Sequence, residues 1–161
     1  MSVTLGEVNQ EIVTAPGEPT VVARHFSTLF PTTAKGAHTA RHAAVSWLVG
    51  ERDRPEPDDG STATVSLIIA ELTANAAVHG RAAGRSARLA LTLTGPVLRI
   101  EVTDARGERP PRPRPVAEAD GESGRGLLLV ESLADAWGCE PHHPGGKTVW
   151  ADCLWRGEAA R

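Results

Sequence analysis

The segment from Ser61 to Gly80 has the residue spacing of a long helix that is packed on one side. Its apolar residues recur at intervals of three and four, which places them in one stripe along a helix. They are Val65, Ile68, Ile69, Leu72 and Ala76. Glu71, Asn75 and His79 follow one another at intervals of four and form a polar row beside that stripe. Because a buried carboxylate or amide needs partners, this polar row is either an ordinary solvent-facing side or part of a binding site.

The composition is that of one globular domain with a sizeable core. Of the 161 residues, 40% are hydrophobic and 23% are charged, which argues against a disordered chain. The formal net charge is −3, so we expect no nucleic-acid partner. No apolar run approaches the ~18–20 residues of a membrane span, and the N-terminal residues lack the pattern of a signal peptide. We therefore expect a cytoplasmic protein with no membrane partner.

The cysteine and histidine residues give no sign of a metal site. Cys139 and Cys153 lack metal-ligand spacing, and a reducing compartment argues against a disulfide. They are therefore interpreted as two structural thiols. His142 and His143 are interpreted as a surface pair beside a turn.

The order of the expected elements predicts an α+β fold. The domain covers residues 20–155, between a flexible arm at 1–19 and a short tail at 156–161. The expected elements are a strand at 21–30, helices at 33–49 and 61–80, a hairpin of strands at 87–94 and 97–104, a helix at 126–137, and strands at 139–142 and 148–154. This order favours a two-layer sandwich with about three helices on one face of a mixed, mostly antiparallel sheet. Residues 106–123, rich in proline and arginine, are expected to form a lid or binding loop.

Several residues near the polar row have side chains suited to a nucleotide. Asp104, at a strand end, can accept a hydrogen bond from an exocyclic amine such as that of adenine. Gly124-Arg125-Gly126 opens a helix, where backbone N–H groups and the helix dipole favour phosphate. Asn75 can hold Mg²⁺ through its carbonyl oxygen, and Glu71 can take a proton from an attacking hydroxyl or water.

Each of these motifs alone also has an ordinary structural explanation. Asp104 is of a type common in turns, a Gly-x-Gly often only ends a loop, and Thr148 suits a strand. His79 before Gly80 either neutralises the helix C-terminus or contacts a phosphate. Arg125 is either a solvated charge or a phosphate ligand. Their joint occurrence in this order favours ATP binding.

Over residues 20–155 the chain resembles the ATP-binding fold shared by gyrase B, the heat-shock chaperone ATPases, MutL and the catalytic domains of histidine kinases. Within that superfamily it looks most like the small anti-sigma-factor serine kinases and the single-domain ATP-binding regulators of actinomycetes. Glu71 to Gly80 resembles the N box, and Val102 to Gly107 resembles the first glycine box. Gly124 to Leu127 resembles the second glycine box, and Gly146 to Thr148 resembles the final box.

The resemblance implies ATP and Mg²⁺ as cofactors and gives each motif a role. Glu71 would be the catalytic base, and Asn75 would be the Mg²⁺ ligand. The residues that would contact ATP are Asn75, His79, Asp104, Gly107, Gly124, Arg125, Gly126, Leu127 and Thr148. The chain departs from the family in the first glycine box, where only Gly107 remains of a pattern that runs Asp-x-Gly-x-Gly. Adenine recognition is still expected, with a changed turn and lid geometry.

The resemblance also implies partner proteins. One hypothesis is a serine/threonine kinase that phosphorylates an anti-sigma-factor antagonist and also sequesters a sigma factor, with a homodimer as one assembly that it allows. The alternative is a nucleotide-dependent module that switches partners without turnover, which the altered glycine box favours. A histidine-kinase fragment is not expected, because no pair of long helices with a phospho-accepting histidine precedes the domain. A topoisomerase or chaperone is not expected either, because no transducer domain follows it.

Overall fold

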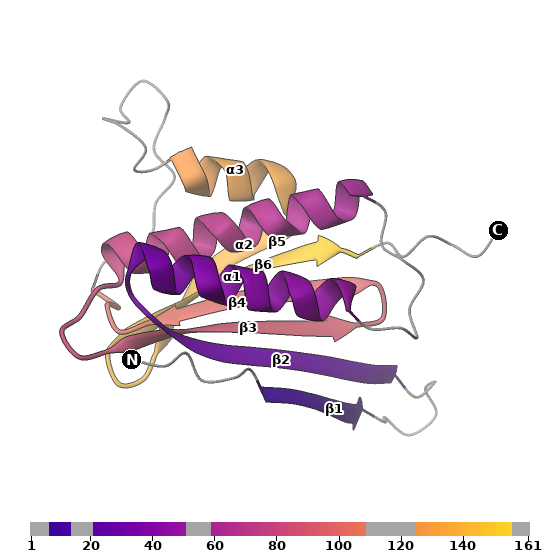
Figure 1. The fold of residues 1–161 in the computed structure, drawn as a ribbon, viewed down its shortest axis with the longest axis horizontal. Coiled ribbons are helices and arrows are strands. Elements are labelled where there is room, and N and C mark those ends of the chain that lie inside the picture. The colour runs from indigo at the N-terminus through magenta and orange to yellow at the C-terminus, as the bar shows by residue number, and fades with distance from the viewer. Residues whose placement is uncertain (1–6, 14–20, 51–58, 109–124, 156–161) are drawn as a thin grey trace.

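A computed structural model of the protein describes residues 7–13, 21–50, 59–108 and 125–155. In this part of the chain, three helices lie over one face of a six-stranded sheet (Figure 1). The strands are β1 (Glu7–Val13), β2 (Val21–Pro31), β3 (Ser86–Thr94), β4 (Val97–Asp104), β5 (Ala136–His142) and β6 (Gly146–Leu154). The helices are α1 (Ala34–Val49), α2 (Asp59–His79) and α3 (Arg125–Leu133). This is the α+β sandwich that the order of elements predicts.

The sheet has one face under the helices and one face that no described helix covers. Its order is β1-β2-β3-β4-β6-β5. Every neighbouring pair is antiparallel, in line with the mixed, mostly antiparallel sheet that the sequence predicts. Alternate residues of β3, β4 and β6 are buried under the helices, as the period of two in a strand requires. The residues between them point to the other side, which we call the open face. Its side chains include Arg88, Thr92, Arg99, Glu101 and Thr103.

The core lies between the helices and the sheet. Its largest fully buried side chains include Phe30, Leu48, Ile68, Ile69, Leu72, Leu89, Leu91, Leu98, Ile100 and Val130. Helix α1 contributes mainly alanines, which allow it to pack closely on β2 and α2. Thr33 caps this helix, because its side chain accepts a hydrogen bond from the Gly36 N–H at 3.0 Å.

Helix α2 passes through the middle of the helical layer, between α1 and α3 (Figure 1). Its expected apolar stripe is buried, since Val65, Ile68, Ile69, Leu72 and Ala76 are at most 2% exposed. The stretch Gly60–His79 is also long and apolar enough to cross a membrane by length and composition. This corrects the expectation that no run approaches that length. A helix that packs against two neighbouring helices and a sheet is apolar on more than one side, which explains its high hydropathy here.

Two elements differ from the sequence expectations. Strand β1 lies in the segment that was expected to be a flexible arm, and it pairs with β2 along its whole length. Helix α3 ends at Leu133 rather than at residue 137, because β5 begins at Ala136 and pairs there with Asp152 of β6. In both cases the deciding hydrogen bonds come from the next strand in the chain. Of the expected lid, residues 109–123 lie outside the described part of the chain.

Candidate functional site

The C-terminal end of α2 lies directly against the end of β4. A Cβ atom at Gly80 would lie 2.6 Å from Cβ and Cγ of Asp104, so the close approach requires a glycine. The Gly80 N–H donates to the Ala76 carbonyl at 3.0 Å and extends the helical hydrogen bonding beyond the last turn. The polar row of α2 therefore leads directly to Asp104.

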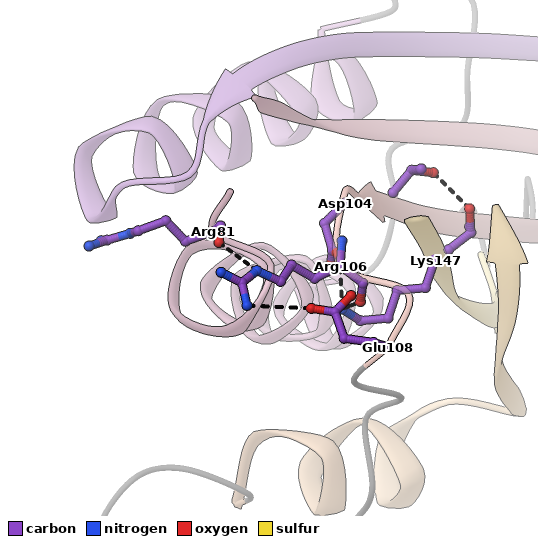
Figure 2. A network of polar contacts seen from close by, with 7 residues as sticks. Arg81, Asp104, Arg106, Glu108 and Lys147 are labelled. Carbon is purple, nitrogen blue, oxygen red and sulfur yellow. Dashed lines mark hydrogen bonds and ion pairs between the residues drawn. The ribbon is translucent and has the colours of Figure 1, made fainter. Parts of the chain in front are cut away.

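Asp104 is buried, and a lysine neutralises its charge (Figure 2). Nζ of Lys147 donates to Oδ1 of Asp104 at 2.8 Å and to the Arg106 carbonyl at 2.7 Å. The Arg106 backbone N–H donates to the same Oδ1 at 2.8 Å. The two charged side chains are only 6% and 4% exposed, and a buried ion pair needs such additional hydrogen bonds to offset its desolvation. This network holds the Asp104 carboxylate in one position.

Lys147 is a site residue that the sequence analysis missed, and Thr148 points elsewhere. Successive residues of a strand point to opposite faces, and Lys147 shares the buried side of β6 with Val149. Thr148 lies on the open face, where its Oγ1 is 2.8 Å from Oγ1 of Thr103. The structure therefore does not bring the Thr148 hydroxyl to Asp104. Alternation counted back from Val149 is the sequence signal that would have placed Lys147 on the buried side.

The start of the expected lid is attached to the β5–β6 turn. The Gly107 N–H donates to the Gly145 carbonyl at 2.8 Å, and a Cβ at Gly107 would lie 2.7 Å from that oxygen. Arg106 donates from Nε to the Arg81 carbonyl at 2.9 Å and pairs with Glu108 at 3.4 Å (Figure 2). In place of one glycine of the Asp-x-Gly-x-Gly pattern, this segment has an arginine that bridges the end of β4 to the loop after α2.

The N-terminal end of α3 lies against α2. The position of a Cβ at Gly126 is occupied by the Glu71 carboxylate, so a side chain here would require that carboxylate to move. Leu127 is buried, and Arg125 is exposed at the first position of the helix. The unpaired N–H groups of a helix N-terminus favour anions. Gly124 lies outside the described residues.

Asn75 and His79 lie on α2 between its contact with Gly126 and its contact with Asp104. Gly80 follows Glu71 by nine positions, which corresponds to about 13 Å along a helix. Asn75 is partly exposed, and within the described part of the chain its amide makes no hydrogen bond. His79 lies in the last turn of α2, a position that suits both of its expected roles. The candidate site therefore extends along α2 from Asp104 to Gly126.

Comparison with known families decides the family to which this fold belongs. The family model of the histidine kinase-like ATPase domain matches residues 30–152, which contain all the site residues above. The chain belongs to the histidine kinase-like ATPase family. A search of curated proteins found no match. Membership of the histidine kinase-like ATPase family implies ATP binding and an ATPase-like or kinase-like activity.

The residues of this histidine kinase-like ATPase fit an adenine nucleotide. Oδ1 of Asp104 accepts two hydrogen bonds, whereas Oδ2 accepts none from the described residues. Lys147 therefore neutralises the carboxylate without using the oxygen that an exocyclic amine would need. The amide of Asn75 is likewise available to a ligand, one helical turn after Glu71.

Proposed function

We propose that this histidine kinase-like ATPase is a cytoplasmic serine/threonine kinase that phosphorylates an anti-sigma-factor antagonist and binds a sigma factor. The observation that supports the proposal is the arrangement along α2. An available carboxylate oxygen of Asp104 lies at one end, Glu71 lies against Gly126 at the other end, and Asn75 lies between them. A nucleotide with its adenine amine at Asp104 and its phosphates at the start of α3 would extend along this helix.

In this proposal the start of α3 stabilises the phosphate charge. Its backbone N–H groups and Arg125 would act as donors to phosphate oxygens. The described residues contain no group of three His, Cys, Asp or Glu side chains that could hold a metal ion. Asn75 would therefore hold Mg²⁺ together with phosphate oxygens and water, as this ion prefers. When bound, Mg²⁺ would supply charge neutralisation for phosphoryl transfer.

Glu71 is the proposed general base. Its carboxylate lies against the first turn of α3, beside the proposed position of the phosphates. It would accept the proton of a serine or threonine hydroxyl while the γ-phosphoryl group is transferred from ATP to that oxygen and ADP leaves. The contact with Gly126 would orient the carboxylate for this step.

A module that switches partners without turnover is the second candidate. Arg106 favours it, because its bonds to Arg81 and Glu108 replace part of the glycine-rich turn at the start of the lid. A segment held by such bonds is less free to close over phosphates. In both candidates the proposed partners are a sigma factor and its antagonist, and a homodimer is the proposed assembly.

Two substitutions and one control test the two candidates. Glu71→Gln keeps the size and hydrogen bonding of the side chain but removes the base. If the protein is a kinase, this variant should transfer phosphate ~10²-fold or more slowly, while its affinity for ATP stays nearly unchanged. Asn75→Ala should weaken both Mg²⁺-dependent ATP binding and transfer, because it removes an oxygen ligand. Glu131→Gln, at an exposed position of α3, is the matched control and should change neither.

The measurement is transfer of labelled phosphate from ATP to the cognate antagonist by the full chain and each variant. Transfer by the wild type that is lost in Glu71→Gln and kept in Glu131→Gln supports the kinase. No transfer by the wild type, together with ATP-dependent binding of a partner, would establish the switch instead. Phosphate transfer that persists in Glu71→Gln would exclude Glu71 as the general base.

A further inference from the structure

The open face of the sheet contains a hollow of about 590 Å³ near the end of β4. Its base is a row of three residues on adjacent strands: Leu29 of β2 pairs with Arg88 of β3, and Arg88 pairs with Thr103 of β4. These three residues lie on the face opposite to the helices. The hollow is therefore separate from the candidate nucleotide site along α2, although Asp104 borders both.

Two loops form the sides of this hollow, and hydrogen bonds hold both of them. On one side is the loop between α2 and β3, with Ala82, Ala83 and Arg85; the Arg106 Nε bond to the Arg81 carbonyl fixes its start. The other side is the β5–β6 turn with His142, His143 and Pro144, which the Gly107 bond to the Gly145 carbonyl attaches to the end of β4. The hollow is thus largely formed before any ligand binds.

The hollow is lined by cationic and neutral side chains. Arg85, Arg88, His142 and His143 all line it, and all four are exposed. Within the described residues, neither arginine forms an ion pair. Among the described residues that line it, Asp104 is the one carboxylate, and it is already paired with Lys147. The chain has a net charge of −3, so this is a local basic surface on an acidic protein.

We propose that the hollow binds an acidic peptide segment of a partner protein. The chemistry that fits is a run of carboxylates with an apolar side chain, because the arginines and histidines surround the apolar Leu29 and Pro144. A peptide fits better than a small free anion, since each exposed cation contributes little by itself and several such pairs are needed at once. Complementary charge would also speed the encounter of the two proteins. The proposal does not depend on phosphoryl transfer or on nucleotide binding.

The experiment measures fluorescence anisotropy of a labelled hexaglutamate peptide with the full chain, without nucleotide, at physiological salt. Arg85→Glu combined with Arg88→Glu should weaken binding by at least about tenfold. The matched control is Lys35→Glu combined with Arg41→Glu on α1, which changes the net charge equally on the helical side. It should change the affinity by less than about twofold, because the Debye length is only about 8 Å.

Four results would overturn the proposal. The first is that the wild type does not bind the peptide, and the second is that both double variants bind it equally weakly. The third is that saturating ATP displaces the peptide, and the fourth is that free glutamate or inorganic phosphate binds as tightly as the peptide. The last result would make the hollow a small-anion site, and displacement by ATP would place the peptide in the nucleotide site. If thermal melts show that the Arg85→Glu/Arg88→Glu variant is unfolded, the same comparison is made with glutamine in place of glutamate in both double variants. A failure of the kinase assay leaves this measurement unaffected.

Discussion

At the scale of single residues, Asp104 and Lys147 are the only buried charged residues in the described part of the chain. Lys147→Met keeps most of the apolar stem but leaves the Asp104 carboxylate without its cation. We expect the free energy of unfolding to fall by about 3–5 kcal/mol, the usual result of removing one partner of a buried ion pair. The measurement is urea denaturation of the purified chain.

A second ion pair provides the control for that change. Arg99 and Asp152 make two hydrogen bonds of 2.7 Å on the open face, but their side chains are 43% and 21% exposed. Arg99→Met should therefore cost only about 1–2 kcal/mol, including its contact with the Trp150 ring. If Lys147→Met and Arg99→Met lowered the free energy of unfolding equally, burial would not be the reason that the Lys147 pair contributes more to stability.

The Cys153 thiol makes stability depend on pH in alkaline solution. Burial raises the pKa of Cys153 from 9.0 to about 12. Between these values the unfolded chain loses the thiol proton while the folded chain keeps it, so the free energy of unfolding falls as pH rises from about 9 to about 12. The chain contains no tyrosine to add its own titration there. Cys153→Ala should give a flatter plot of urea midpoint against pH in this range. An unchanged slope would show that the Cys153 thiol does not cause the loss of stability.

At the scale of elements, local periodicity explains which parts of the fold could be predicted. The stripe of α2 and the β3–β4 hairpin follow spacings visible within one segment, and the structure has both elements. Strand β1 and the first residues of β5 are defined by pairing with the strand that follows each of them, and no pattern within their own residues revealed them. The site divides in the same way. Spacing on one helix identified the Glu71–Asn75–His79 row, whereas the Lys147 contact with Asp104 requires the β4–β6 pairing.

The contact between α2 and β4 gives a prediction about packing. Gly80 does not have a positive φ, so an alanine there meets no backbone penalty and only the contact with Asp104 opposes it. Because Lys147 and the Arg106 N–H hold that carboxylate, Gly80→Ala should destabilise the fold by about 1–3 kcal/mol, the usual cost of overpacking. Gly126→Ala is the comparison, since its new Cβ first meets the flexible end of Glu71. It should cost less in urea denaturation, and a larger loss for Gly126→Ala would contradict this account.

At the scale of the whole molecule, the end of β4 connects two surfaces. Asp104 faces Gly80, the residue after α2, on the helical side and borders the basic hollow on the other side. The β5–β6 turn supplies both the residues that line this hollow and, at the start of β6, the lysine that pairs with Asp104. A nucleotide bound along α2 would therefore contact α2, the end of β4 and the start of α3, and should stabilise the entire domain.

That expectation leads to a prediction about base specificity. ATP at about 100 times its Kd should raise the free energy of unfolding by about 2.7 kcal/mol, which corresponds to a Tm increase of roughly 5–10 °C for a chain of this size. GTP at the same concentration should give a much smaller shift, because guanine has a carbonyl oxygen where adenine has its amine, and that oxygen cannot donate to Asp104. Asp104→Asn should reduce the Tm increase with ATP. It should also narrow the difference between the Tm increases with ATP and with GTP, because a side-chain amide can donate to the guanine oxygen. Thermal melts of both proteins with each nucleotide test this, and equal shifts with ATP and GTP for the wild type would exclude Asp104 as the residue that recognises adenine.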